Sequence, residues 1–261
     1  MYVVIVDALS TGIFLASVFK QYGYECIHLL TSTQITQTIL KRLNLSDFKI
    51  SFNVENFPNQ ASIIDVLSQY PIQFIIPGSE SGVILADQLA FQLGVIKNNI
   101  DNLFSRRSKF EMHEVLRSAD LLSAQQIRSN DVEEIFTWYQ KQNFKKVILK
   151  PEYSAVSDNV SLCKNKNEIA RAFEQIMTTT NLYGIENTTL VVQEYLCGPE
   201  YIVNTISVGG KHFVTDIWLG IDEREEDISA DLYADLVHPS QKNYKELVHY
   251  VKQVDKATLF L

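Results

Sequence analysis

The sequence predicts an α/β fold for about the first hundred residues and an α+β fold after them. In the first part, strand-like and helix-like segments alternate, which favours a parallel sheet joined by right-handed crossovers. In the second part, strands with a period of two flank a Gly-Gly turn, which favours antiparallel pairing. The 261 residues, 46% of them hydrophobic, suffice for about one to two domains. We expect the boundary near residues 98–105.

The first part begins with a strand suited to burial on both faces. Tyr2–Val6 is a β-branched run, and it leads through the polar turn 7–12 into a helix that ends before Gly23, a typical C-cap residue. The other expected strands are 25–30, 50–54 and 72–76, and the expected helices are 13–22, 33–43, 59–69 and 83–93.

The second part mixes amphipathic helices with short strands. Gly209-Gly210-Lys211 separates its last two strands and predicts a hairpin. The expected helices are 108–118, 132–142, 168–177 and 244–251, and the expected strands are 146–151, 160–163, 190–195, 201–208 and 212–218.

Charge and composition exclude several classes of protein. With 23 basic and 31 acidic residues, the net charge of −8 argues against a basic nucleic-acid clamp. Most of this charge lies in residues 222–235, where seven acids face one base, Arg224. Three cysteines without a CxxC motif support neither a disulfide framework nor a zinc knuckle. Without a basic n-region or a long apolar run, we expect no signal peptide and no membrane span, and therefore a cytoplasmic protein.

The first motif with chemical content is a lysine at the end of an apolar strand. Lys150 follows Val147-Ile148-Leu149, and an ammonium there is costly unless it meets an anion. Pro151 stops the strand, and the small residues of 154–159 let the next loop approach a ligand with its backbone N–H groups. The alternative is an ordinary surface lysine.

The second motif is a strand that leads into polar and aromatic residues. Val191-Val192-Gln193-Glu194-Tyr195-Leu196 precedes Gly198-Pro199-Glu200. Such a segment is suited to bind a heteroaromatic ring through its backbone and a ribose through Glu200. The alternative is a plain strand–turn–strand connection with exposed acids.

In this order, about forty residues apart, the two motifs resemble the ATP-grasp superfamily. The resemblance is to carboxylate–amine ligases related to carbamoyl-phosphate synthetase and L-amino acid ligases. The segments that carry it are 6–12, 77–83, 107–112, 149–160, 192–201 and the hairpin end 212–218. The resemblance implies a Rossmann-like N-terminal domain (1–100), a linker helix (101–125) and an ATP-grasp nucleotide-binding region (126–261).

The resemblance also implies roles for individual residues. Lys109 and Lys150 would neutralise ATP phosphates, and the loop with Ser154, Ser157 and Asp158 would close over them. The adenine would be held by Gln193, Glu194, Tyr195 and Leu196, and the ribose hydroxyls by Glu200. ATP would phosphorylate a carboxylate, and an amine would then displace phosphate from the acyl-phosphate.

Three positions depart from the family pattern. Gln193 replaces a usual glutamate, and Ala155 and Asn159 replace usual glycines. The family holds Mg²⁺ with an acidic strand residue and a later Glu-x-Asn segment. The sequence ends at Leu261 without that segment, so we expect the ATP-grasp region to lack its C-terminal part. The run of Glu223, Glu225, Glu226 and Asp227 is interpreted as a solvated loop, and no catalytic or metal-ligating residue is assigned.

The expected function is an ATP-dependent carboxylate–amine ligase, or a shortened version of one that binds ATP. The alternative is a non-catalytic nucleotide-binding or protein-interaction module on the same fold, and the metal-ligand segment is the feature that separates the two. The expected cofactors are ATP and Mg²⁺. The expected partners are small carboxylic acids and amines, without nucleic acid or membrane, and a homodimer is a candidate assembly.

Overall fold

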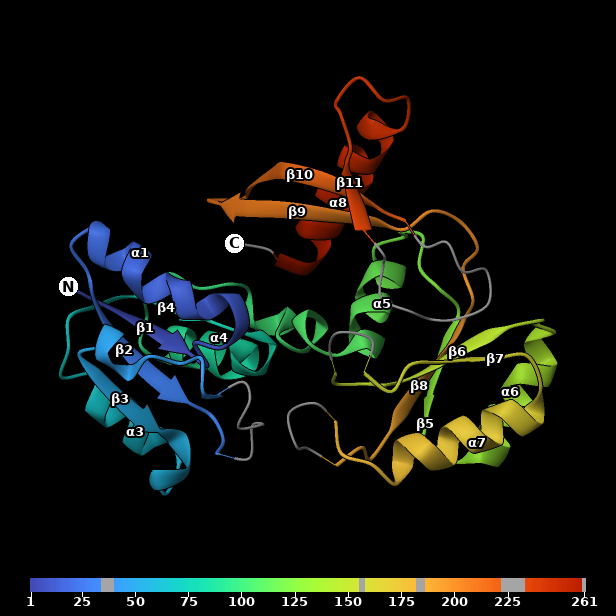
Figure 1. Ribbon diagram of the computed structural model, residues 1–261, viewed down its shortest axis with the longest axis horizontal. Helices are drawn as coiled ribbons and strands as arrows, with labels where there is room; N and C mark the ends of the chain where they lie inside the picture. Colours follow the sequence, from blue (N-terminus) through green and yellow to red (C-terminus); the bar gives the residue numbers. More distant parts are fainter. Residues whose placement is uncertain (34–39, 155–157, 182–185, 222–232, 260–261) are drawn as a thin grey trace. The chain divides into compact units, whose positions relative to one another are not determined.

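The described residues of the chain form two compact units, each with a hydrophobic core of its own (Figure 1). The computed structural model describes residues 1–33, 40–154, 158–181, 186–221 and 233–259. The first unit is Met1–Arg107, and the second comprises the described residues from Ser108 on. No helix in these ranges is long and apolar enough to cross a membrane. Most of the helix expected at 33–43 lies outside the described residues.

The first unit contains a four-stranded sheet of order β3-β2-β1-β4. All three pairs of neighbouring strands are parallel, which confirms the expected parallel sheet. The strands are β1 (Tyr2–Val6), β2 (Glu25–Leu30), β3 (Ile50–Asn53) and β4 (Ile72–Pro77). The helices are α1 (Leu15–Gln21), α3 (Gln60–Leu67) and α4 (Val83–Gln92).

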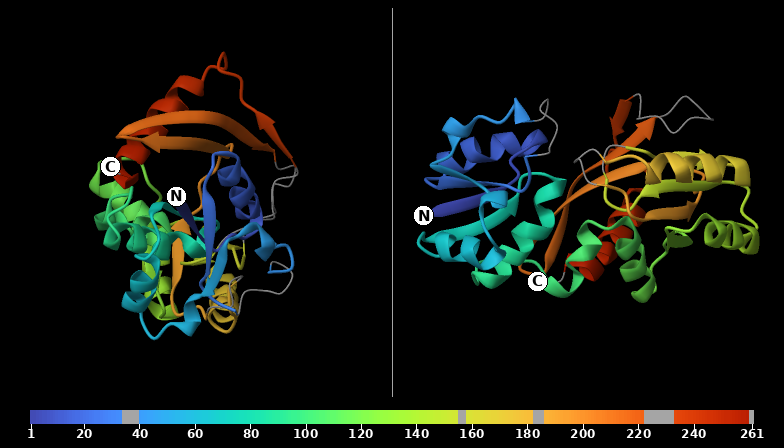
Figure 2. Two further views of the ribbon diagram at one scale, coloured as in Figure 1. Left: turned by 90° about the vertical axis from the view of Figure 1, so that its left-hand side faces the viewer. Right: turned by 90° about the horizontal axis from the view of Figure 1, so that it is seen from below.

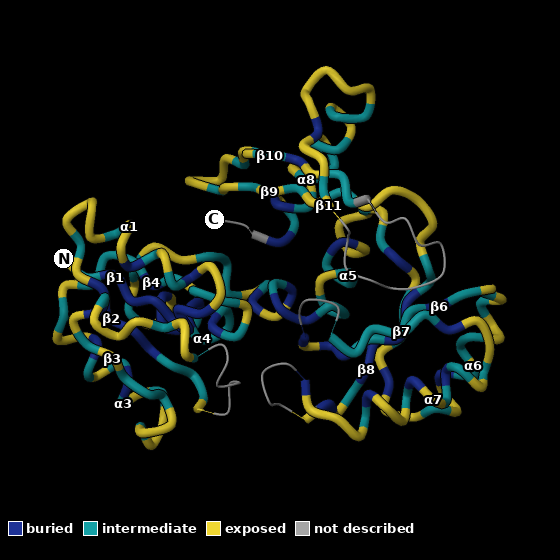
Figure 3. The backbone as a smooth tube through the Cα atoms, in the orientation of Figure 1, coloured by how far each residue is buried: buried dark blue, intermediate teal, exposed yellow. Residues whose placement is uncertain are grey.

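Both faces of this sheet are covered, as Figures 1 and 2 show. Successive side chains of a strand point to opposite faces. Val4 and Val6 of β1 therefore pack with residues of α3 and α4, whereas Val3 and Ile5 pack with Ala16 of α1. The four residues are fully buried (Figure 3). Burial on both faces explains why this segment is apolar without alternation.

The second unit contains a four-stranded antiparallel sheet of order β5-β8-β6-β7. Its strands are β5 (Gln126–Ser129), β6 (Val147–Pro151), β7 (Ser161–Cys163) and β8 (Leu190–Glu194). The helices α6 (Val132–Gln142) and α7 (Lys166–Met177) pack against one face of this sheet. The strand β5 was not among the expected strands. It is only four residues long and partly polar, so its residues carry little local signal for a strand.

A three-stranded sheet of order β11-β10-β9 completes the second unit. Its strands are β9 (Tyr201–Val208), β10 (Lys211–Ile221) and β11 (Tyr233–Leu236), and the helix α8 (Tyr244–Leu259) packs on it. The predicted hairpin is confirmed, because β9 and β10 are antiparallel and Gly209 and Gly210 have φ of +55° and +70°. Positive φ at both central residues is what a two-residue hairpin turn of type I′ requires.

The helix α5 (Lys109–Ser118) opens the second unit and packs against β5 and α8. Ser108 caps it, since the hydroxyl oxygen accepts a hydrogen bond from the Glu111 N–H (3.1 Å). Serine with glutamate three residues later is a typical sequence signature of a helix N-terminus. This cap places Lys109 at the first position of the helix.

Candidate functional site

One face of the β5-β8-β6-β7 sheet is apolar under α6 and α7, and the opposite face carries polar side chains. In the register, Gln126 pairs with Gln193, and Val191 pairs with both Arg128 and Lys150. Paired residues and residues two apart along a strand share a face. These side chains therefore lie together on the face turned away from α6 and α7.

Lys150 is the cation on this face that has no hydrogen bond or ion pair among the described residues. Burial, and then the positive charge of Lys109, lower the pKa of Lys150 from its ordinary value to about 8. Two ammonium groups near each other in a partly buried setting repel, and an anion between them relieves the repulsion. The pair Lys109 and Lys150 is therefore suited to bind a phosphate group.

Lys109 is held beside the chain segment that follows β6. Its backbone N–H donates to the Glu152 carbonyl (3.3 Å), and its Nζ donates to the Ser154 carbonyl. The Ser154 hydroxyl donates to Asp158 Oδ2 (2.6 Å), so these two residues of the segment after β6 are in contact. Asn159 has a φ of +54°, a value that asparagine adopts more readily than most residues. Ser157 and Ala155 lie outside the described residues.

Glu152 connects three elements around this pair, and it was not among the expected site residues. Glu152 is 4% exposed. Its Oε1 accepts from the Ser108 hydroxyl (2.5 Å) and from Arg128 Nη1 (3.0 Å), and its Oε2 accepts from the Thr189 hydroxyl (3.0 Å). A glutamate directly after a strand-ending proline is the signal that could have identified it. Because Glu152 binds the cap residue of α5, it fixes where Lys109 begins the helix.

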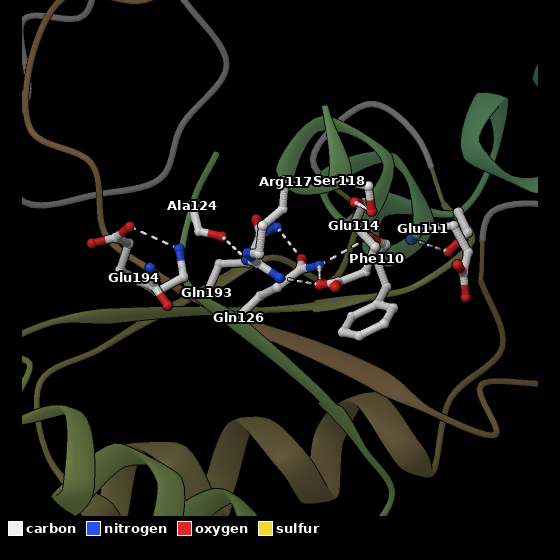
Figure 4. Close-up of polar contacts among 11 residues, drawn as sticks. Phe110, Glu111, Glu114, Arg117, Ser118, Ala124, Gln126, Gln193 and Glu194 are labelled. Atoms are coloured by element: carbon white, nitrogen blue, oxygen red, sulfur yellow. Dashed lines mark hydrogen bonds and ion pairs between the residues drawn. The ribbon is translucent and has the colours of Figure 1, made fainter. Parts of the chain in front are cut away.

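Gln193 and Gln126 join the polar face to α5 (Figure 4). Gln193 Nε2 donates to Gln126 Oε1 (2.9 Å). Gln126 Nε2 in turn donates to the Phe110 carbonyl (2.9 Å) and to Glu114 Oε1 (2.8 Å). The Gln193 side-chain oxygen has no partner among the described residues, so it is available to accept a hydrogen bond from an amino group.

The other residues expected at an adenine and a ribose lie at and beyond the end of β8. Glu194 Oε1 accepts from the Gln125 N–H (2.8 Å), and Lys146 Nζ lies 5.3 Å from the centroid of the Tyr195 ring. Leu196 is 66% exposed, and Glu200 is also exposed. No hydrogen bond joins the Glu200 carboxylate to the lysine pair among the described residues.

No residue in the described ranges is assigned to the magnesium that the resemblance implies. In the described ranges, no three His, Cys, Asp or Glu side chains gather in a way that could hold a metal ion. Glu223, Glu225, Glu226 and Asp227 lie outside these ranges. We therefore assign no chemical step to a metal.

Comparison with known proteins identifies relatives of the chain by sequence and by fold. Residues 107–217 match the family described as phosphoribosylglycinamide synthetase, ATP-grasp (A) domain. The chain is 31% identical over 217 residues to dapdiamide A synthase of Enterobacter agglomerans, covering 83% of this chain and 51% of that protein. It thus spans about half the length of the relative it matches.

Solved structures show the same fold. The L-amino acid ligase from Bacillus licheniformis superposes with a TM-score of 0.73 at 14% identity, over 98% of this chain and 60% of that chain. N5-carboxyaminoimidazole synthetase from Staphylococcus aureus complexed with ADP gives a TM-score of 0.65 at 14% identity, over 100% and 63% of the two chains. The solved structures share the fold of this chain, and the sequence matches to an ATP-grasp domain and to a synthase show that the chain belongs to the ATP-grasp superfamily.

Proposed function

We propose that the chain acts as an ATP-dependent ligase that joins a carboxylic acid to an amine through an acyl-phosphate. The observation that carries the proposal is the pair Lys109 and Lys150, two neighbouring ammonium groups of which Lys150 has no counter-charge among the described residues. Because one structural neighbour is an L-amino acid ligase, we take L-amino acids as the substrate class for the acid and the amine.

The proposed reaction has two steps. A carboxylate oxygen attacks the γ-phosphorus of ATP, and the bond to ADP breaks. The amine nitrogen then attacks the acyl carbon, the C–O bond to phosphate breaks, and the nitrogen loses a proton. In such chemistry the protein contributes mainly positioning and neutralisation of charge.

Each part of the site has a task in this proposal. Lys109 and Lys150 neutralise the phosphates, and the loop that contains Ser154, Ser157 and Asp158 covers them. The adenine contacts Gln193, Glu194, Tyr195 and Leu196, and Glu200 receives the ribose hydroxyls. The proposal retains a Rossmann-like domain at 1–100, a linker helix at 101–125 and the nucleotide-binding region at 126–261, supported by the parallel sheet of the first unit and by α5.

Calorimetric titration with ADP tests the phosphate site. We expect the wild type to bind ADP and Lys150→Ala to bind it at least about tenfold more weakly, because one charge-assisted contact is lost. Lys145→Ala is the matched control, since it removes an exposed lysine five residues earlier and should bind as the wild type does. Equal affinity of all three proteins would show that Lys150 does not contact phosphate.

A turnover assay separates the ligase from the alternative. The ligase is supported if ADP is released from ATP only when two substrates are both present, one amino acid that supplies the carboxylate and one that supplies the amine. Binding of ADP without such release, across a panel of L-amino acid pairs, would instead support the non-catalytic nucleotide-binding module.

A further inference from the structure

His113 lies on α5 one helical turn after Lys109. Residues four apart project from the same face of a helix, so the imidazole is next to the lysine that begins α5. The helix is fastened to the segment after β6 through Lys109 and to β5 through Gln126. The His113 Nδ1 atom is buried and has no hydrogen-bond partner among the described residues. A buried polar atom without a partner is rare and calls for an explanation.

Burial and the surrounding charges keep this imidazole neutral. Burial, then the positive charges of Lys150 and Arg117, lower the pKa of His113 to about 4, and only Glu114 acts in the opposite direction. Arg128 of β5 is paired with Glu111 and Glu152. The helix α8, which also packs against α5, contributes Tyr250, whose hydroxyl donates to the Leu122 carbonyl beyond the end of α5. Of these groups, Lys150 is the one that a bound anion would neutralise.

We propose that His113 is a third cationic group of the anion site, neutral while the site is empty and protonated when a nucleotide phosphate is bound. This inference rests on the proposed nucleotide binding at Lys109 and Lys150. A diphosphate brings at least two negative charges to the lysine pair, which cancels the field of Lys150 and favours imidazolium. A ligand that binds the protonated form more tightly raises the affinity for the proton by the same factor.

Two residues then take up protons in different ranges of pH. The pKa of Lys150 is about 8 in the empty protein, so above this pH an anion draws a proton onto Lys150. At pH 6 Lys150 is already charged, and the proton taken up goes to His113. Among the residues of the site, only His113 therefore takes up a proton when the anion binds at pH 6.

The experiment counts protons during ADP binding. Calorimetric titrations at pH 6.0 and pH 8.5, each in buffers of different ionisation enthalpy, give the number of protons taken up per ADP. We expect His113→Gln to take up about half a proton less than the wild type at pH 6.0, to bind ADP about twofold more weakly there, and to match the wild type at pH 8.5. ADP titrates equally in both measurements and cancels in the difference. His249→Gln, at an exposed histidine of α8, should match the wild type at both values of pH.

A second measurement does not depend on the variant. The pKa of the His113 ring, followed by NMR, should rise from about 4 in the empty protein to about 6 with saturating ADP. An unchanged pKa, or equal proton uptake by wild type and His113→Gln at pH 6.0, would overturn the inference while leaving the proposed function intact. Failure of the wild type to bind ADP at either pH would contradict the proposed function and the inference together.

Discussion

Lys150 occupies a position where burial and a neighbouring ammonium both oppose its charge. A buried lysine of this kind reduces the stability of the protein without ligand, since its charged form is solvated less well than in the unfolded chain. Binding sites accept this cost because the same unsatisfied charge is what attracts the ligand. The structure therefore predicts a conflict between stability and binding at this residue.

We expect Lys150→Met to stabilise the protein in the absence of nucleotide. The pKa of Lys150 falls from 10.5 to about 8, and allowing for partial exposure, removing the charge should raise the free energy of unfolding at pH 7 by about 2 kcal/mol. Because the folded-state pKa is lowered, the cost is full below pH 8 and disappears as the pH rises from 8 to 10.5. Urea unfolding at pH 7 and pH 10 measures both effects.

Lys145→Met is the control for this substitution, since Lys145 is exposed and its loss should change the free energy of unfolding by less than about 0.5 kcal/mol. A Lys150→Met protein less stable than the wild type at pH 7 would mean that the ammonium gains more from its surroundings than burial costs it.

At the scale of elements, the loops after β1 and β4 are joined at the carboxyl ends of the parallel strands. Asp7, fully buried after β1, accepts hydrogen bonds from the Thr31 N–H (2.8 Å), the Thr31 hydroxyl (2.6 Å) and the Ser81 hydroxyl (2.5 Å). Burial raises the pKa of Asp7 although these hydrogen bonds lower it. Gly12 and Gly78 allow the two loops to approach within backbone contact.

Gly12→Ala should separate these loops. An added Cβ would lie 1.9 Å from the Gly78 carbonyl oxygen, so backbone must move, and we expect a loss of about 3 kcal/mol or more in the free energy of unfolding. Gly23→Ala is a contrasting control, because a Cβ at Gly23 would meet no atom within 4 Å. Its only cost should be the strain of an alanine at a φ of +81°, about 1 kcal/mol in the free energy of unfolding. Urea unfolding followed by circular dichroism compares the two. Similar losses for both would indicate that the loops after β1 and β4 are not closely packed.

At the scale of the whole molecule, each unit contains a buried histidine that stays neutral. His28 in β2 is fully buried, its Nδ1 pairs with the Ser51 hydroxyl (2.9 Å), and its Nε2 has no partner among the described residues. Burial lowers the pKa of His28 to about 4, as it does that of His113 in the second unit. A fall in pH should therefore destabilise both units for the same reason, because a buried imidazole resists the proton that the unfolded chain takes up.

We expect the wild type to lose stability as the pH falls from about 6.5 to 4. The unfolded chain takes up a proton at the ordinary histidine pKa and the folded chain does not, so the contribution of His28 is complete above pH 6.5 and falls by up to about 3 kcal/mol toward pH 4. His28→Gln should show a correspondingly flatter profile of unfolding free energy against pH. Parallel profiles for the two proteins would indicate that His28 is protonated equally in the folded and unfolded states.

Much of the architecture could be predicted from local patterns. The uninterrupted apolar run Tyr2–Val6 predicted a strand covered on both sides, and Gly209-Gly210 predicted the hairpin that joins β9 and β10. These features depend on the residues themselves and on their nearest neighbours along the chain. The lengths of β10 and α8, which run beyond their expected ends, depend on packing within the second unit.

The sequence by itself determined the classes of fold, the positions of Lys109 and Lys150 in their segments and the family they resemble. Only the tertiary structure decided that Val191 pairs with Lys150 on one side and Arg128 on the other, that Glu152 binds the cap of α5, and that His113 comes under the influence of Lys150. The reason is physical. Strand propensity and capping act over a few residues, whereas burial, pairing across a sheet and the field of a charge join residues that lie tens of positions apart.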